Sequence, residues 1–401
     1  MRFNESRRYT GGSMGTVVMK FGGSSVADTA RLRQVAEIVV QRQRAGDRVV
    51  VVVSAMGKTT DALIAQAREV SPAPQQRELD LLVTAGERIS MTLLSMAIHE
   101  LGGDAISFTG SQSGIITEPS HQGARILEVR PIRLIEALES SRIVIVAGYQ
   151  GVSTNKEVTT LGRGGSDTTA VALAAALNAD TCEIYSDVDG VYSGDPNICQ
   201  QARFLREINY EVMQAMALSG AKVLNADAVE FAKKAGIAIL ARKSGDKSGR
   251  ETRVQGATVC SGVTAVVLAP AVTRICGAGR LPELLFTING MGGRVMAIHH
   301  DDKFDILVDR TGVPGRDAER LAQAAQKADF VATDVSVVSV VGTGLASRPS
   351  LYAEISKVLS AVACEILGTF ITELALSVVV ETALAIAAVK ALHQALIIDQ
   401  Q

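Results

Sequence analysis

Two kinds of apolar pattern alternate along the first 260 residues of this chain. Short runs of β-branched residues, including five consecutive valines at 49–53, are typical of strands buried on both faces of a parallel sheet. A second such run lies at 142–152. Between 28 and 44 the apolar residues recur at helical spacing, and Gly46 follows as a stop signal. Strands that alternate with helices predict an α/β fold.

The pattern changes after about residue 260, where two segments of similar plan follow, at about 264–331 and 334–401. The second is the clearer one, and its apolar runs predict the order strand, helix, strand, strand, helix, strand. Its last predicted strand is LIID, at 396–399. This βαββαβ order is ferredoxin-like. The segment offers no obvious catalytic groups, so binding or dimerisation is its expected role.

Glycine-rich loops follow two of the predicted strands. Lys20 ends the first strand and precedes Gly22-Gly23, and the valine strand ends in a small-residue turn at 54–57. Glycine lets backbone amides approach an anion closely, and a helix N-terminus adds partial positive charge. A glycine pair after a strand can also be a plain turn. Two such loops at the carboxyl ends of strands in one sheet favour a phosphate site, because ligands of open α/β sheets bind there.

A third glycine loop lies before the Ala-rich helix predicted from about 166. Gly162, Gly164 and Gly165 surround Arg163, and Ser166 and Asp167 open the helix. Ser and Asp at a helix start are ordinary capping residues, but capping does not explain the arginine. A guanidinium group binds a carboxylate or a phosphate through two parallel hydrogen bonds.

An acidic turn follows the next predicted strand and contains Asp187, Asp189 and Asp195. Asp and Gly form turns in any protein, so the turn can be purely structural. Beside two anion-binding loops, these carboxylates could instead hold a nucleotide or its Mg²⁺.

Composition excludes several classes of function. Of 401 residues, 40 are Lys or Arg and 42 are Asp or Glu. This balance leaves no excess of positive charge that would indicate binding to nucleic acid or to an anionic membrane. No apolar run reaches membrane-spanning length, and the polar residues 1–15 are expected to form a disordered arm or an upstream start before Met14. The five scattered cysteines predict neither a zinc site nor disulfides, which suits a reducing cytoplasm.

Six motifs, in this order, resemble those of the aspartate kinases, in the amino-acid kinase superfamily. They are KFGGSSV at 20–26, SAMGKTTD at 54–61, TAGERIS at 84–90, FTGSQSG at 108–114, TTLGRGGSDTTA at 159–170 and SDVDGVY at 186–192. The resemblance implies an amino-acid kinase domain at 16–260, an open, mainly parallel sheet with helices on both faces. It also implies a regulatory region at 261–401 with two ferredoxin-like ACT modules, the first degenerate.

The activity that this resemblance implies is phosphoryl transfer from ATP, with Mg²⁺, to the β-carboxylate of L-aspartate, which gives 4-phospho-L-aspartate. A carboxylate has a pKa of about 4, so the nucleophile is already ionised and catalysis is positioning plus charge stabilisation. The implied catalytic residues are Lys20, on the transferred phosphate, and Asp167, which orients Lys20. Arg163 would hold the α-carboxylate of aspartate and Glu87 its α-amino group.

Further site residues are implied by position in the same way. Those expected to line the aspartate pocket are Ser54, Thr60 and Ser166. Those expected to bind nucleotide are Lys20, Gly22, Gly23, Ser24, Ser186, Asp187, Tyr192, Asp195 and Lys222. No residue is assigned as a metal ligand.

The chain departs from the family pattern in several places. Asn197 replaces the usual Arg after Asp-Pro, and Asn225-Ala226 replaces His-Pro. The first ACT segment lacks the usual Asp-Lys-Pro-Gly turn and reads GAGRLPE at 277–283, with His299-His300 at the expected effector strand. We therefore expect lysine and threonine to inhibit weakly or not at all. The feedback effector itself cannot be named from the sequence.

Two alternatives remain open at this stage. One is a paralogue that phosphorylates another acidic amino acid, and the other is a non-catalytic amino-acid sensor built on a degenerate kinase. The retention of Lys20, Glu87, Arg163 and Asp167 speaks against the sensor. Ferredoxin-like modules with exposed sheet edges commonly pair with a second copy, so a homodimer or larger homo-oligomer is expected.

Overall fold

The computed structural model describes residues 15–162, 164–246, 248–256, 258, 262–278, 281–290, 293–311 and 331–400. They form two compact units. The first unit runs to Asp189 and includes Lys234–Arg250, and the second comprises Gly190–Lys233 and the chain from Glu251 onward. The N-terminal arm before Gly15, Arg163 and part of the GAGRLPE segment lie outside the described residues, so the expectations for them stay predictions.

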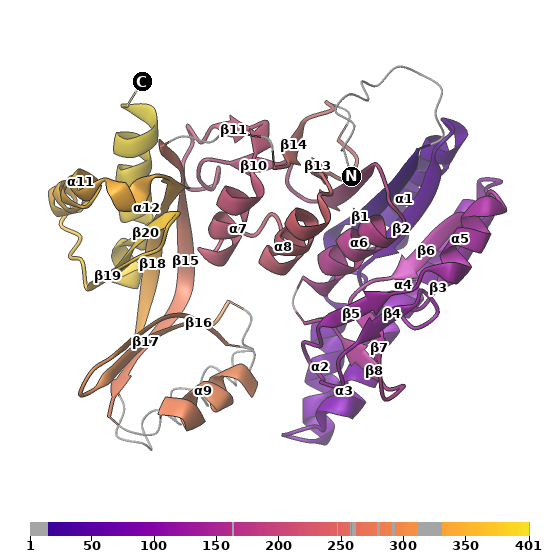
Figure 1. The fold of residues 1–401 in the computed structure, drawn as a ribbon, viewed down its shortest axis with the longest axis horizontal. Helices are drawn as coiled ribbons and strands as arrows, with labels where there is room; N and C mark the ends of the chain where they lie inside the picture. Colours follow the sequence, from indigo (N-terminus) through magenta and orange to yellow (C-terminus); the bar gives the residue numbers. More distant parts are fainter. Residues whose placement is uncertain are drawn as a thin grey trace, which may run out of the picture. The chain divides into compact units, whose positions relative to one another are not determined.

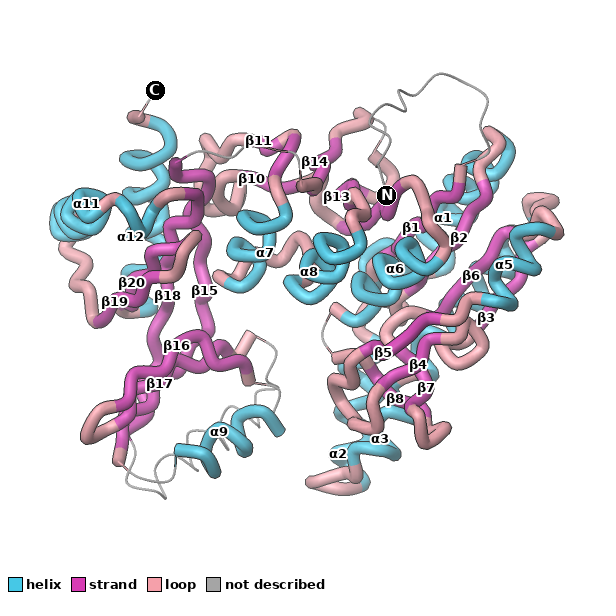
Figure 2. Tube along the Cα trace, in the orientation of Figure 1, coloured by secondary structure: helices cyan, strands magenta, loops and turns pink. Residues whose placement is uncertain are grey.

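Six parallel strands form the centre of the first unit (Figures 1 and 2). They are β1 (Thr16–Phe21), β2 (Arg48–Val53), β3 (Ala105–Phe108), β6 (Ile143–Ala147), β9 (Thr181–Ser186) and β13 (Ile239–Lys243). Their order is β13-β9-β1-β2-β6-β3, and every neighbouring pair is parallel. The five valines of β2 are buried, which confirms the prediction of a strand covered on both faces. The carboxyl ends of all six strands therefore meet at one edge.

Helices cover both faces of this sheet. On one face lie α1 (Thr29–Arg44) and α4 (Ala85–Glu100), which share a core with β1, β2 and β6. The Ala-rich α6 (Gly165–Ala176) packs on β1, β2 and β9. The α1 helix begins where the Asp28 side chain accepts a hydrogen bond from the Arg31 amide. This architecture confirms the predicted α/β class.

A smaller mixed sheet extends the first unit. Its strands are β4 (Ile115–Thr117), β5 (Ile126–Val129), β7 (Gln150–Ser153) and β8 (Val158–Thr160), in the order β5-β4-β7-β8. The remaining helices of the first unit are α2 (Thr59–Val70), α3 (Gln76–Val83), α5 (Ile132–Glu139) and the short 3₁₀ turn η1 (Gly23–Val26). The run at 142–152 is not one strand, because Tyr149 adopts a positive φ of 69° and turns the chain from β6 into β7.

The helical stretch Gln76–Glu100 is long and apolar enough to cross a membrane by length and composition alone. The expectation that no apolar segment reaches that length was therefore wrong. The segment is two helices, and 44% of its most apolar window is buried inside the protein. Its second helix, α4, packs on α1, β3 and β6, as the core helix of a globular unit does.

The second unit begins with short elements and continues into a six-stranded antiparallel sheet. The short elements are β10 (Val191–Tyr192), β11 (Phe204–Leu205), β12 (Glu207–Ile208), α7 (Tyr210–Leu218), the start of α8 (Ala226–Ala235) and β14 (Glu251–Val254). The sheet strands are β15 (Gly262–Gly277), β16 (Arg294–His300), β17 (Phe304–Asp309), β18 (Val331–Thr343), β19 (Gly368–Ile371) and β20 (Ala375–Val380). Their order is β16-β17-β15-β18-β20-β19.

Two halves of this sheet share the long strands β15 and β18, which pair along most of their lengths. The helix α9 (Leu281–Gly290) covers one half, and α11 (Pro349–Ala361) with α12 (Ala385–His393) covers the other. A break in register between Ala269 and Val272 separates the halves along β15. The remaining elements are the short turns η2 (Leu345–Ser347), η3 (Thr382–Leu384) and η4 (Gln394–Ile398).

The predicted last strand at 396–399 was wrong. Residues Gln394–Ile398 continue α12 as a π-helical turn, and Leu396 and Ile397 are buried in the core of this half. The reason is that both edges of β18 are already occupied: β20 pairs on one side, and the first half of β15 pairs on the other, with Val266 opposite Val340. The fourth strand of this half therefore comes from before residue 270.

Candidate active site

The end of β1 and the start of α6 bring an ion pair together in the first unit. Lys20 Nζ lies 2.6 Å from Asp167 Oδ1, and the two side chains are only 12% and 11% exposed. Asp167 lies in the first turn of α6, where a carboxylate is favoured by the helix dipole. The pair fixes the ammonium group of Lys20 at the carboxyl edge of the sheet.

The glycine loop after β1 packs against the loop after β2. A Cβ atom on Gly23 would lie 2.9 Å from the Ala55 carbonyl oxygen, so a side chain has no room there. The Gly57 amide donates to the Gly23 carbonyl at 3.0 Å. The Gly22 amide donates to the Tyr185 carbonyl at 3.1 Å, so Gly22 ties the loop to β9 and its amide is not free for a phosphate.

Three of the predicted pocket residues lie at this same edge. Ser54 directly follows β2, and its amide donates to the Phe21 carbonyl at 3.1 Å. Thr60 is in the first turn of α2. Ser166 lies against the end of β6, where a Cβ on Gly148 would come within 2.7 Å of Ser166 Oγ. Glycine at 148 is therefore required for the Ser166 hydroxyl to reach the sheet edge.

Glu87 is a buried carboxylate next to the loop after β2. It is 3% exposed, and its Oε1 accepts a hydrogen bond from the Ala55 amide at 3.1 Å. Among the residues that the structure describes, its Oε2 is buried without a hydrogen-bond partner. Burial raises the pKa of Glu87 to about 7. A buried oxygen of this kind is expected to meet a donor or a cation when a ligand is present.

The predicted nucleotide-binding residues belong to both units. Ser186 is the last residue of β9 and Asp187 follows it, both in the first unit, and Ser186 Oγ accepts from the Val188 amide at 3.3 Å. Ser24 lies in η1, also in the first unit. The others lie in the second unit and are Tyr192, Asp195 and Lys222. Asp195 Oδ1 accepts from the amide and the side chain of Asn197, at 2.9 and 3.0 Å, which closes the turn locally.

Two buried carboxylates in the first unit, Asp80 and Glu183, were not foreseen. Glu183, on β9, accepts hydrogen bonds from Arg42 at 3.1 Å, Arg242 at 3.0 Å and the Tyr185 hydroxyl at 2.8 Å. Its partners balance the charge, so Glu183 has a structural role in tying α1 and β13 to the centre of the sheet. A charged residue inside an apolar run is the sequence signal that could have pointed to both.

Metal binding by the protein alone has no support in the described part of the chain. There, no group of three or more His, Cys, Asp or Glu side chains is placed to hold a metal ion.

Comparison with known proteins finds a matching family model, similar sequences and similar solved structures. Residues 15–241 match the model of the amino acid kinase family. The aspartokinase of Mycolicibacterium smegmatis is 44% identical, over 95% of this chain and 96% of the relative. The solved structure of E. coli aspartokinase III in complex with aspartate and ADP superimposes with a TM-score of 0.80 at 24% identity, over 95% of this chain and 99% of that one.

A second structure of the E. coli enzyme, in complex with lysine and aspartate, superimposes with a TM-score of 0.75, also at 24% identity and over 95% of this chain and 99% of that one. At 24% identity the two structures support the fold only. The assignment to a family rests on the full-length match to the M. smegmatis aspartokinase. The buried Lys20–Asp167 pair and Glu87 lie in the region that the family model covers. The chain therefore belongs to the amino acid kinase family and, within it, to the aspartokinases.

Proposed function

We propose that this aspartokinase transfers the γ-phosphoryl group of MgATP to the β-carboxylate of L-aspartate at the carboxyl edge of the first unit's sheet. The observation that carries the proposal is the buried Lys20–Asp167 pair, 2.6 Å apart, in the same unit as a buried glutamate with one unpartnered oxygen. The product, 4-phospho-L-aspartate, is the first intermediate towards lysine, threonine and methionine.

Lys20 stabilises the transferred phosphoryl group. The acceptor carboxylate is ionised at neutral pH, so the barrier is the approach of an anion to a polyanion rather than removal of a proton. A fixed ammonium group in a largely buried site is worth more than the same charge in water. Asp167 holds that ammonium group in place. Gly22 lies directly beside it, since a Cβ there would be in van der Waals contact with Lys20 Nζ, at 3.5 Å.

Glu87 and Arg163 hold the amino-acid end of aspartate. The unpartnered Oε2 of Glu87 accepts from the α-ammonium group, which supplies the missing cation. Arg163 binds the α-carboxylate, and Ser54, Thr60 and Ser166 line the aspartate pocket. The glycines on either side of Arg163 have φ values of 75° and 69°, a left-handed conformation that glycine adopts at little cost.

The nucleotide is bound in the first unit by Gly23 and Ser24 after β1 and by Ser186 and Asp187 after β9. For Tyr192, Asp195 and Lys222, nucleotide binding stays an expectation from the sequence. Mg²⁺ arrives with ATP as part of the substrate, and its charge offsets that of the phosphates. We assign the enzyme to the cytoplasm, a compartment that suits the four unpaired cysteines in the described part of the chain.

The test is ADP release by the purified full-length protein with MgATP and a panel of acidic amino acids. We expect release to depend on aspartate and to be about tenfold or more slower with glutamate, which has one extra methylene group. Release that is equally fast with glutamate or N-acetylglutamate would instead indicate a paralogue with another substrate. Aspartate binding in calorimetry without any turnover would indicate an amino-acid sensor.

A homodimer through the second unit is also proposed. The six-stranded sheet has two edge strands, β16 and β19, and each exposes a large apolar side chain: Ile298 is 49% exposed and Ile371 is 56% exposed. Edge strands with apolar side chains are suited to pairing with another copy.

We expect sedimentation of the full-length protein at micromolar concentration to give at least a dimer. The variant with both Ile298→Lys and Ile371→Lys should shift towards monomer, whereas Tyr352→Lys, an exposed position on α11, should not. A wild-type monomer would exclude this assembly.

A further inference from the structure

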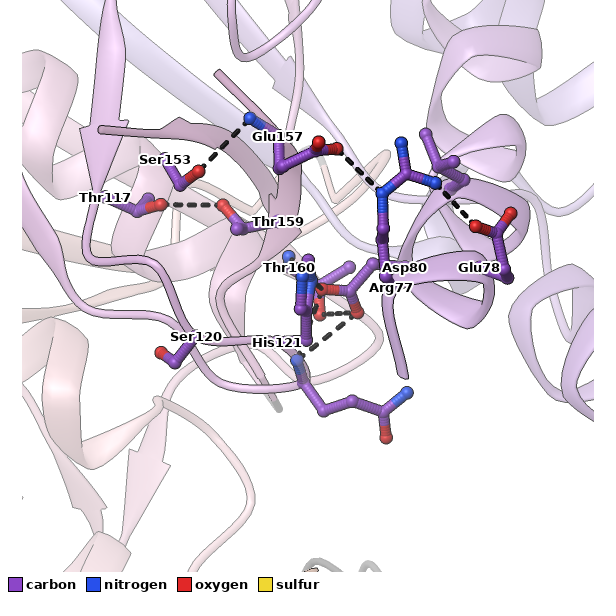
Figure 3. Close-up of polar contacts among 12 residues, drawn as sticks. Arg77, Glu78, Asp80, Thr117, Ser120, His121, Ser153, Glu157, Thr159 and Thr160 are labelled. Atoms are coloured by element: carbon purple, nitrogen blue, oxygen red, sulfur yellow. Dashed lines mark hydrogen bonds and ion pairs between the residues drawn. The ribbon is translucent and has the colours of Figure 1, made fainter. Parts of the chain in front are cut away.

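Asp80, on α3, is a fully buried carboxylate that four hydrogen-bond donors surround (Figure 3). His121 Nδ1 lies 2.8 Å from Oδ2, and the Thr160 hydroxyl lies 2.8 Å from Oδ1. The amides of Thr160 and Gln122 donate at 3.2 and 3.3 Å. An ionised carboxylate only accepts hydrogen bonds, so the Nδ1 of His121 carries the proton.

Asp80 and its donors come from three segments that are far apart in the sequence. Asp80 belongs to α3, His121 and Gln122 to the loop between β4 and β5, and Thr160 to the end of β8. The Ala124 amide also donates to the Thr160 carbonyl at 2.8 Å, and Gln122 has a φ of 64°, a conformation that costs a non-glycine residue free energy. Asp80 is thus the common acceptor that holds the loop and the strand end against α3.

Two of the three segments that Asp80 joins lead to residues of the proposed aspartate site. The α3 helix runs through Thr84 into α4, whose first turn carries Glu87. The β8 strand runs through Gly162 to Arg163 and then into α6 with Asp167. The loop also touches this connection, since a Cβ on Gly162 would lie 3.2 Å from the Cα of Gly123.

We propose that Asp80, with His121, is the positioning residue that fixes the Arg163 loop relative to Glu87. It would thereby set the spacing between the two side chains that bind the α-carboxylate and the α-ammonium group of aspartate. The inference rests on the proposed function, because it assigns the two ends of aspartate to those side chains. Asp80 is fully buried and its oxygens are occupied, so it acts through the elements it joins and not by contact with substrate.

A carboxylate suits this position because its two oxygens accept all four donors at once. In Asp80→Asn, one oxygen becomes an amino group, which cannot accept from Thr160 or Gln122. Loss of an acceptor leaves buried donors unpaired, and the segment that bears Arg163 is expected to shift. Displacements of about 1 Å in a site can cost about a hundredfold in rate.

The test compares steady-state constants of Asp80→Asn, His121→Ala and His121→Asn with those of the wild type. Asp80→Asn and His121→Ala should raise the KM for aspartate about tenfold or more and leave the KM for ATP within about twofold. His121→Asn keeps a donor near the position of Nδ1 and should restore a near-normal KM for aspartate. Equal effects of the two His121 variants, or equal rises in both KM values, would overturn the positioning role.

The matched control is Thr159→Val, one residue before Thr160 on the same strand. The Thr159 hydroxyl is buried and makes its 2.7 Å hydrogen bond to Thr117 Oγ1, not to Asp80 (Figure 3). This variant should lower the midpoint of thermal unfolding without changing the KM for aspartate. An equal rise in that KM would show that any damage to β8 suffices, which would also overturn the proposal.

Failure of this inference is distinguishable from failure of the proposed function. If the wild type releases no ADP in the presence of aspartate, the proposed function fails. If the wild type is active and the Asp80→Asn and His121→Ala variants retain its KM for aspartate, only the positioning role fails. Should Asp80→Asn not fold, the pair of His121 variants still decides the question, because His121 is partly exposed at the edge of the cluster.

Discussion

Replacement of Lys20 with alanine is expected to lower kcat by at least about a hundredfold while the KM for aspartate changes little. A preorganised donor that faces the charge of the transition state typically contributes a factor of this size. The ammonium group is held 2.6 Å from Asp167 and is largely buried, so water cannot replace it at low cost. Because aspartate is held elsewhere, by Glu87 and Arg163 in the proposed site, ground-state binding of aspartate should survive.

The measurement is coupled ADP release at saturating MgATP and aspartate, with aspartate affinity followed separately by calorimetry. Lys357→Ala is a suitable control, because Lys357 is exposed on α11 in the second unit. Near-normal turnover in Lys20→Ala would show that this lysine does not stabilise the transferred group. A large loss of aspartate affinity with unchanged kcat would move Lys20 from the phosphate to the amino acid.

The parallel sheet could be predicted because each of its strands has a recognisable local sequence pattern. Five valines in β2 fit only a strand that is covered on both faces, and helical spacing with a glycine stop marks α1. Strand ends followed by glycine then locate the edge where Lys20, Ser54 and Ser166 lie. The helix-start residues before α6 mark the position of Asp167 in the same way.

Strand pairing in the second unit could not be predicted from local pattern. The run at 396–399 is as apolar as a strand, but a strand needs a free edge, and the first half of β15 already occupies the edge of β18 that it would use. That pairing joins residues about 75 positions apart in the chain, such as Val266 and Val340. Alternation of apolar residues indicates which face of a strand is buried. It does not indicate which other strand pairs with it.

The Asp80 cluster escaped prediction for a related reason. A single charged residue on a helix is more often solvent-exposed than buried. The residues next to Asp80 in the sequence form no motif that would mark it as a buried hydrogen-bond acceptor. Its partners His121 and Thr160 lie 41 and 80 residues further along the chain. Only the folded arrangement brings the donors together, so the sequence can indicate a charge inside an apolar run but not which donors surround it.

Affinity for aspartate is expected to rise about tenfold between pH 6 and pH 8 and to level off above that range. Burial raises the pKa of Glu87 from 4.5 to about 7, so below pH 7 the side chain is mostly neutral in the free enzyme. An α-ammonium group needs the ionised form as its partner. Each pH unit below 7 therefore costs about a factor of ten in the fraction of enzyme that is ready to bind.

Calorimetry in buffers of different ionisation enthalpy provides the check. Binding ionises Glu87, so about half a proton should be released per aspartate bound at pH 7, and less as the pH rises. Glu87→Gln should bind aspartate weakly at every pH and lose both the slope and the proton release. A slope that persists in Glu87→Gln would assign it to another group, and proton uptake by the wild type would contradict the assignment directly.

The same pKa fixes the sign of a stability effect. An acid whose pKa is raised in the folded state stabilises the fold only while it is protonated, so its contribution falls as the pH rises from 4.5 to about 7 and is then lost. The free enzyme thus carries an ionised, half-partnered carboxylate at pH 8, and the ammonium group of aspartate relieves that cost. Aspartate should accordingly raise the midpoint of thermal unfolding more at pH 8 than at pH 6, and this difference should vanish in Glu87→Gln.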